Sequence, residues 1–197
     1  MDLNKVRDRA LSIVKNPLTE LTKVKAEEIK PMDLITQYIA ILAVIPAIAT
    51  IIGWGFVGVG FFRYSIIAAI VGGILTYILS IAGVYISGIV INTLAPNFAS
   101  KQSDVQAMKL AAYAATPGLL GGIFNIIPML SILAFLCSLY GLYILYLGIP
   151  VLMETPKDKV LIYTIAVIVV MIVIYFIIGA ITGTIMTAMS PMPYIYR

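Results

Sequence analysis

The chain has 197 residues, of which 61% are hydrophobic and 11% charged, and its formal net charge is +4. A soluble domain of this length could not bury so much apolar surface, so the composition predicts an integral membrane protein. With no histidine and one cysteine, Cys137, the chain lacks the commonest general base and cannot form an internal disulfide or a thiolate metal cluster. We attribute the basic excess to lysines beside the membrane and expect no nucleic-acid partner.

Residues 1–31 form a polar region before the first hydrophobic run, and they lack the apolar core of a signal peptide. Apolar side chains recur there at helical spacing, namely Leu3, Val6, Ala10, Ile13 and Val14. Asn16 and Pro17 end this helix and can cap a second short helix, in which Lys23 and Glu27 can pair. The region is therefore an amphipathic cytoplasmic segment on anionic headgroups or, alternatively, a solvated charged arm.

The membrane domain, residues 32–197, begins with a predicted span at 34–53, close to the roughly 20 helical residues that cross about 30 Å of hydrocarbon. Pro46 lies inside this span and predicts a kink, because a proline removes one backbone donor. The loop that follows, residues 54–64, predicts an aromatic belt at one membrane interface. Its aromatic residues are Trp54, Phe56, Phe61, Phe62 and Tyr64.

The second predicted span, residues 65–93, is longer than the hydrocarbon requires and should tilt or project. Small residues recur along one seam of this helix, namely Ala69, Gly73, Thr76, Ser80, Gly83 and Ser87. Such a seam predicts close helix packing, and the alternative is a polar lining for a pathway.

The third predicted helix follows a polar loop, in which Ser103 and Gln106 form a plausible capping box. Lys109 lies in the first turns of this helix. We expect it to snorkel to the headgroups; the alternative is that it faces a water-filled cavity beside Tyr113. A second seam of small residues comprises Ala111, Ala115, Gly118 and Gly122.

Residues 113–156 predict a membrane hairpin that organises the rest of the chain. Thr116, Pro117 and Gly118 are expected to interrupt its first helix, and a tight turn is expected from Asn125 to Pro128.

The return helix of the hairpin, residues 127–153, is the fourth predicted span. It carries Tyr140, Tyr143 and Tyr146 at three-residue spacing, which indicates helix packing rather than a binding surface. Gly148 and Pro150 predict a second interruption near its end.

The fifth predicted span, residues 160–189, places Gly179, Gly183 and Thr187 four residues apart, which predicts a third close-packing face. The expected fold is thus an all-α, five-span bundle with an amphipathic N-terminal segment. All the basic residues except Arg63 and Arg197 fall on one side of this arrangement, so the positive-inside rule predicts a cytoplasmic N-terminus and an external C-terminus.

Three segments carry a resemblance to a known family: NPLTELTKVKAEEI before the first span, YAATP at 113–117, and YGLYILYLGIPVLMETP at 140–156. On these residues the chain resembles the Yip family, the Ypt-interacting proteins and their prokaryotic relatives. The resemblance implies five spans and a cytoplasmic N-terminus. Eukaryotic members are associated with membrane trafficking and with binding prenylated Rab-type GTPases. The N-terminal region here is short and lacks their long cytoplasmic extension, so the chain resembles a prokaryotic plasma-membrane member.

Catalysis is disfavoured, because no Asp or Glu lies in the middle of a span and no cofactor or metal is expected. We favour a non-catalytic protein that organises membranes or docks lipids and cytoplasmic proteins, with a homo-oligomer as another expectation. The alternative is a passive transporter, channel or lipid scramblase with a polar groove near the broken third and fourth helices. The residues expected to line that groove are Thr76, Ser80, Tyr113, Thr116, Asn125 and Tyr140.

Overall fold

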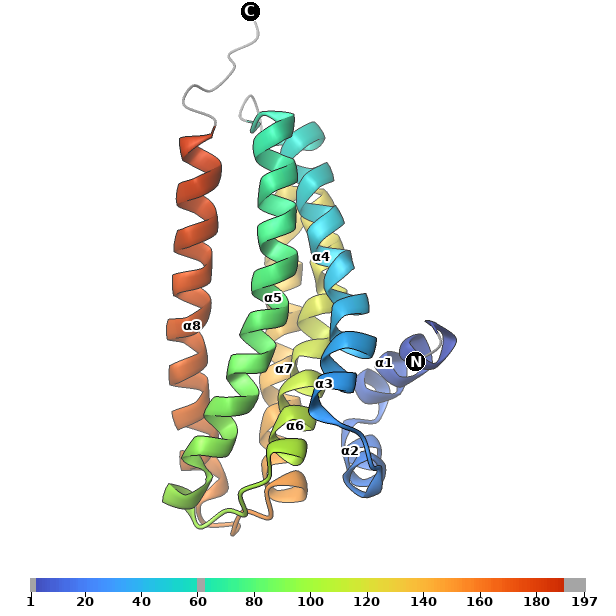
Figure 1. Ribbon diagram of the computed structural model, residues 1–197, viewed down its shortest axis with the longest axis vertical. Helices are drawn as coiled ribbons and strands as arrows, with labels where there is room; N and C mark the ends of the chain where they lie inside the picture. The colour runs from blue at the N-terminus through green and yellow to red at the C-terminus, as the bar shows by residue number, and fades with distance from the viewer. Residues whose placement is uncertain (1–2, 60–62, 190–197) are drawn as a thin grey trace, which may run out of the picture.

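A computed structural model describes residues 3–59 and 63–189, and helices make up its regular structure (Figure 1). The α-helices are α1 (Leu3–Lys15), α2 (Pro17–Ala26), α3 (Pro31–Leu34), α4 (Ala40–Ile52), α5 (Ile66–Leu94), α6 (Asp104–Gly121), α7 (Ser131–Leu152) and α8 (Val160–Ala188). Short π-helical turns are η1 (Ile35–Ile39) and η2 (Gly53–Val57), and 3-10 turns are η3 (Ala95–Phe98), η4 (Gly122–Ile126) and η5 (Pro128–Leu130). The predicted all-α class is confirmed for this part of the chain, and Phe61, Phe62 and Arg197 lie outside the described residues.

Four helical segments within the described ranges are long and apolar enough to cross a membrane: Pro31–Val57, Ile66–Phe98, Pro128–Leu152 and Val160–Ala188. α6 is not among them, although its 18 residues would extend about 27 Å and it packs beside α5 and α7. Most of its side chains are buried, so α6 does not need the apolar surface of a helix that faces lipid. Four of the five predicted spans are therefore supported by length and composition.

Successive long helices run in opposite directions along the bundle (Figure 1). α2 and the connections at 95–103 and 153–159 meet at one end, where Lys25 and Lys101 both pair with Glu154. We call this end, together with α1, the basic end. The last turns of α8 lie at the opposite end.

Small residues allow the central helices to approach closely, as the seams on the second and third predicted helices indicated. A Cβ at Gly73 would lie 2.3 Å from an Ile51 carbon, and one at Gly141 would lie 2.3 Å from the Ala114 carbonyl oxygen. Since side chains cannot fit at such distances, glycine fixes how closely α4 packs on α5 and α7 packs on α6.

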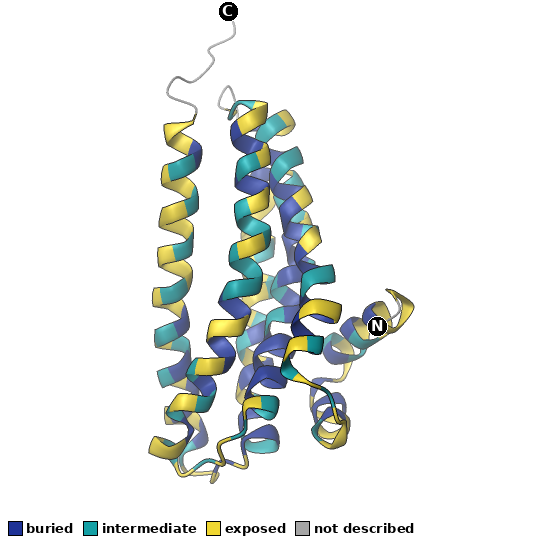
Figure 2. Ribbon diagram, viewed as in Figure 1, coloured by how far each residue is buried: buried dark blue, intermediate teal, exposed yellow. Residues whose placement is uncertain are grey.

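The packing face predicted on the last helix is wrong within this chain. Gly179, Gly183 and Thr187 are exposed, and nothing lies within 4 Å of a Cβ built at either glycine. α8 instead packs on α5 by another face, where Met186 covers Gly72. Much of the ribbon of α8 carries the colour of exposed residues in Figure 2. The four-residue period was correct, but the glycines point away from the bundle.

The predicted interruptions of the third and fourth helices are also wrong. α6 continues through Pro117 to Gly121, and α7 continues through Pro150 to Leu152. A proline removes one helical hydrogen bond, and tight packing of the surrounding helix can tolerate that loss. α4 likewise continues through Pro46.

The hairpin does not turn tightly at 125–128. The chain changes direction through η4 and η5, with Ile127 extended between them at φ −114° and ψ 102°. The extended conformation is expected for a residue before a proline, here the buried Pro128.

Candidate functional site

The two N-terminal helices pack against the membrane bundle. α1 buries Val6, Ala10 and Ile13, as the helical spacing predicted, and α2 buries Leu21 and Val24. α1 contacts α6, and α2 contacts α7. These side chains belong to the same hydrophobic core as the spans, so the region is docked rather than a solvated arm.

Lys109 fixes the end of α2 to α6. Its side chain is only 1% exposed, and its Nζ donates hydrogen bonds to the carbonyl oxygens of Val24 at 2.7 Å and Glu27 at 2.6 Å, with Lys25 O at 3.4 Å. The last carbonyls of a helix lack partners within the helix, and a cation beside them also interacts favourably with the helix dipole. The snorkelling prediction is therefore wrong, because the three ammonium donors are directed at these carbonyl oxygens. Lys109 lines a pocket of about 500 Å³ with residues 25–31, and Tyr113 is not part of that pocket, so the predicted cavity beside Tyr113 is not formed.

The predicted capping box at the start of α6 is half formed. Ser103 Oγ accepts the hydrogen bond from Gln106 N at 3.4 Å, as expected of an N-cap. Gln106 Oε1 does not accept the return bond, because Ser103 N donates to Asn92 Oδ1 at 2.8 Å. Gln106 Nε2 donates instead to Lys25 O at 3.0 Å. Gln106 thus joins Lys109 in holding the end of α2.

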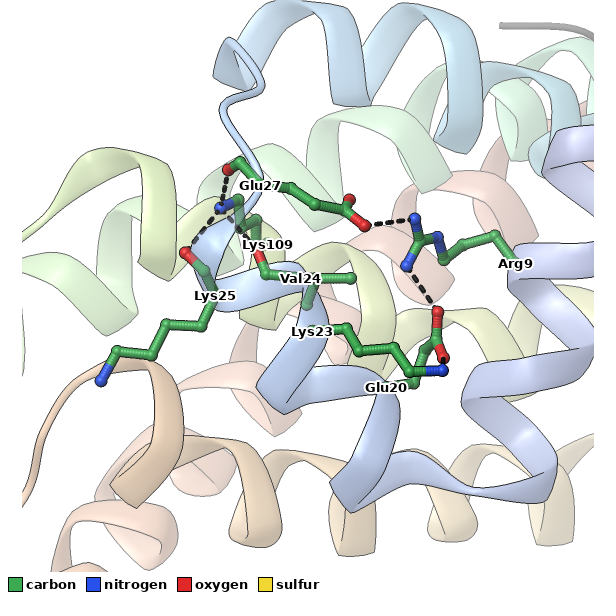
Figure 3. Close-up of polar contacts among 7 residues, drawn as sticks. All are labelled: Arg9, Glu20, Lys23, Val24, Lys25, Glu27 and Lys109. Carbon is green, nitrogen blue, oxygen red and sulfur yellow. Dashed lines mark hydrogen bonds and ion pairs between the residues drawn. The ribbon is translucent and has the colours of Figure 1, made fainter.

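Arg9 joins α1 to both ends of α2 (Figure 3). Its guanidinium donates to Glu20 Oε1 at 2.5 Å and to Glu27 Oε1 at 2.6 Å, and Glu20 is only 8% exposed. Burial alone would lower the pKa of Arg9, but the hydrogen bond to Glu27 and the two negative charges raise it. Lys23 pairs with Glu20 rather than with Glu27, so the pair predicted within α2 is replaced by this network.

Glu154 joins α2 to the two connections at the basic end. Its carboxylate lies 3.0 Å from Lys25 Nζ and 3.8 Å from Lys101 Nζ. The hydrogen bond from Lys25, together with the charge of Lys101, lowers the pKa of Glu154 below its ordinary value.

The helix packing predicted for the three tyrosines of the fourth span is confirmed for Tyr140 and wrong for Tyr143 and Tyr146. Tyr140 donates a hydrogen bond to Val14 O at 2.8 Å, in the last turn of α1. Tyr143 and Tyr146 are exposed at 51% and 42%. A side chain from the bundle therefore donates hydrogen bonds to the end of each helix, Tyr140 for α1 and Lys109 for α2.

Tyr113 and Thr116 are packed rather than exposed to a groove. Thr116 is fully buried; its hydroxyl donates to Ala112 O at 3.0 Å and lies 2.9 Å from the hydroxyl of Tyr38. The rings of Tyr38 and Tyr113 meet edge to face at 5.5 Å. These residues join η1 to α6 and are not part of the predicted polar groove.

Gly148 contributes to the packing at the basic end. A Cβ there would lie 2.4 Å from a Leu110 carbon and 3.4 Å from a Leu21 carbon. Gly148 thus lets α7 approach both α6 and α2, and Pro150 follows within the continuous α7.

A cavity of about 510 Å³ lies among α5, α6, α7 and α8. Of the groove residues proposed from the sequence, Ser80 and Asn125 line it, whereas Thr76, Tyr113, Thr116 and Tyr140 do not. Its walls are mainly apolar, so the structure replaces the predicted polar groove with a hydrophobic chamber.

Arg9, Glu20, Glu27 and Tyr38 were not singled out from the sequence as site residues. The sequence offered one signal for Arg9: it is a basic residue beside the apolar face of the amphipathic helix α1. Its partners are 11 and 18 residues away, beyond a helix boundary that the sequence locates only approximately.

The outer surface of α1 and α2 combines basic and large apolar side chains. Leu3, Leu11 and Leu18 are exposed at 67%, 45% and 52%. Lys15 is exposed one turn from Leu11 on α1, and Lys5 is also exposed on that helix. A helix surface that combines basic and apolar side chains suits binding to anionic lipid headgroups. Within the described residues no group of three or more Cys, Asp or Glu side chains could hold a metal ion.

Comparison with known proteins gives one family. The family model described as the Yip1 domain matches residues 11–179. Inner membrane protein YohC of Escherichia coli strain K12 is 29% identical over 132 residues, which cover 63% of this chain and 68% of that protein, and the protein of the same name in strain CFT073 matches to the same extent. No solved structure matches the chain.

Proposed function

Since the chain belongs to the Yip1 domain family, we propose that it is a non-catalytic inner-membrane protein whose cytoplasmic face binds anionic lipid headgroups and docks other proteins. The proposed face is the outer surface of α1 and α2 at the basic end. One observation carries the proposal: bundle side chains hold the ends of α1 and α2, so their basic and apolar outer surface is presented in a fixed orientation.

The proposed topology has five spans with the N-terminus inside, and α6 is the third span. The length of α6 and its position between α5 and α7 support this count. The concentration of lysines at the basic end supports the orientation. The topology can be tested with two single-cysteine variants, Lys5→Cys and Ala188→Cys, each in a Cys137→Ser chain. An impermeant maleimide is added to intact cells that carry one or the other variant. We expect label at position 188 alone before permeabilisation, whereas equal access at both positions would contradict five spans.

Binding to lipid headgroups can be tested in reconstituted vesicles. A dye on Leu11→Cys, in the Cys137→Ser chain, should shift its emission to the blue as the anionic lipid fraction rises. Each basic residue near an anionic surface contributes about 1 kcal/mol. Lys5→Glu with Lys15→Glu should therefore abolish most of the shift.

The matched control reverses Lys157 and Lys159, which carry the same charges on the connection before α8. This control should keep the emission shift. An emission that does not depend on anionic lipid in the unaltered protein would contradict headgroup binding.

Protein docking is best tested with the same surface variants. Deletion of residues 1–31 is unsuitable, because it would remove core side chains such as Ile13 and Leu21. Crosslinked complexes should be lost in the Lys5 and Lys15 variant while circular dichroism stays unchanged. Retention of all complexes would remove this surface as the docking site.

A second candidate function is passive movement of lipid or neutral solute, which is favoured by the cavity lined by Ser80 and Asn125. Asn125→Leu should slow flux or lipid flip in proteoliposomes without unfolding the protein. Thr116→Val should have no direct effect on the path, since Thr116 lies outside the cavity. Background flux in the unaltered protein would exclude this candidate.

A further inference from the structure

The cavity opens sideways toward the surface of the bundle. Its inner wall includes buried residues, among them Val84 of α5 and Leu119 of α6. Its outer wall includes Phe135 of α7 and Ile172 of α8, which are 57% and 62% exposed. Because the exposed residues belong to α7 and α8, the opening lies between these two helices.

The cavity is elongated along the bundle axis. On α7 its lining runs from Ala134 to Leu145, an interval of about 16 Å at 1.5 Å per helical residue. On α6 it runs from Ala114 to Leu119 and continues to Gly122 and Asn125 beyond the end of that helix. A volume of about 510 Å³ spread over this length describes a narrow slot within the spans.

The lining suits a hydrocarbon better than water or an ion. Among the described residues that line it none is charged, and the polar ones are Ser80, Asn125, Ser138 and Tyr175. The Ser138 hydroxyl already donates to Ala134 O at 3.0 Å. A water molecule needs two to four polar partners, so most of this space would leave water unsatisfied.

We propose that the cavity holds one acyl chain of a phospholipid from the surrounding bilayer, which enters between α7 and α8. Two spanning helices border the opening, so a bilayer lipid is the molecule that faces it. Asn125 lies past the end of α6, where its amide faces the polar part of the lipid, and the chain extends toward Val84 and Leu145. This inference is independent of the surface function of α1 and α2, and a resident lipid requires no transport.

Photo-crosslinking in vesicles tests the site. The full chain is reconstituted with phosphatidylcholine that carries a diazirine at the end of one acyl chain, and labelled residues are mapped by mass spectrometry. Lipids around the bundle label exposed residues such as Ile74, whereas a chain in the cavity also labels Val84 and Leu119, which are 2% and 8% exposed. Label on the exposed residues alone overturns the proposal.

Ser80→Phe fills the cavity from α5, and Ile78→Phe is the matched control because Ile78 is 54% exposed on the same helix and does not line the cavity. We expect Ser80→Phe to reduce label at Leu119 to the level of an unirradiated sample and Ile78→Phe to leave it unchanged. Ala115→Leu fills the same space from α6 and should have the same effect as Ser80→Phe. It therefore replaces Ser80→Phe if that variant folds poorly. Unchanged label in a folded filled variant overturns the proposal.

Discussion

The burial of α6 and α8 is the reverse of the rule for soluble proteins, in which apolar residues are buried and polar residues are exposed. α8 is the most apolar of the four long spanning segments, and most of its side chains are exposed. α6 carries Asp104, Lys109 and Thr116, yet it is buried along nearly its whole length. In a bilayer the apolar surface faces lipid, and the polar and small residues make the contacts between helices. The more polar helix is therefore the one packed among α1, α4, α5 and α7.

Among the substitutions that test this comparison, Lys109→Met is expected to lower the free energy of unfolding most. It leaves the carbonyl oxygens of Val24 and Glu27 without their donor in a buried setting, which costs about 2–4 kcal/mol of unfolding free energy. Denaturant unfolding in detergent, followed by circular dichroism, measures this loss. Lys157→Met in the exposed connection should change stability by less than about 0.5 kcal/mol. Equal stability of the two variants would show that the α2 cap contributes nothing.

Glycine to alanine substitutions on α7 and α8 should change the free energy of unfolding in opposite directions. Gly141→Ala forces a Cβ toward Ala114 O and should destabilise the protein by about 1–3 kcal/mol. Gly179→Ala meets nothing within 4 Å and should stabilise α8 by roughly 0.5–1 kcal/mol through helix propensity. The same unfolding assay compares them. A loss of stability in both would indicate that the Gly179 face is covered, for example by a second copy of the chain.

Tyr140→Phe removes the hydroxyl that caps α1 and should cost about 1 kcal/mol. Tyr143→Phe is the control, because the Tyr143 side chain is 51% exposed one turn away. A fluorophore on α1 should also become more mobile in the Tyr140 variant, as measured by anisotropy. Identical anisotropy in the two variants would mean that the hydrogen bond does not hold α1 in place.

The smallest expected effect is on the pH dependence of the basic end. The pKa of Glu154 is lowered in the folded protein, so its pairing with Lys25 stabilises the fold above the ordinary pKa of 4.5. This contribution is lost as the pH falls through the folded pKa. Unfolding of the unaltered protein and of Glu154→Gln should therefore differ slightly at pH 7 and converge below pH 4.5. A constant difference across this range would contradict the assignment.

The sequence predicted the helices well because each depends on a local pattern. The spacing of Val6, Ala10 and Ile13 identified α1, and Ser103 identified the start of α6. The burial of Lys109 could not be predicted in this way. Its acceptors are 82 to 85 residues away, and a lysine near a helix end has the same local signature whether it reaches water or a carbonyl.

The seams of small residues show the same limit. Gly73 and Gly179 lie in similar four-residue patterns, but only Gly73 faces a neighbour. The period shows that small residues share a face of the helix, and it does not show what lies opposite. The proline positions were misinterpreted for a related reason, because α6 stays helical through Pro117 within a packed environment that the sequence does not display.

The docking of α1 and α2 sets an order of events during synthesis. The chain separates Val24 from Lys109 by 85 residues and Val14 from Tyr140 by 126 residues. At 5–20 residues per second, the ribosome needs roughly 6–25 s to pass from position 14 to position 140. During that interval the first two helices are synthesised without the partners that will hold them, so their final position is set only after α6 and α7 have been made.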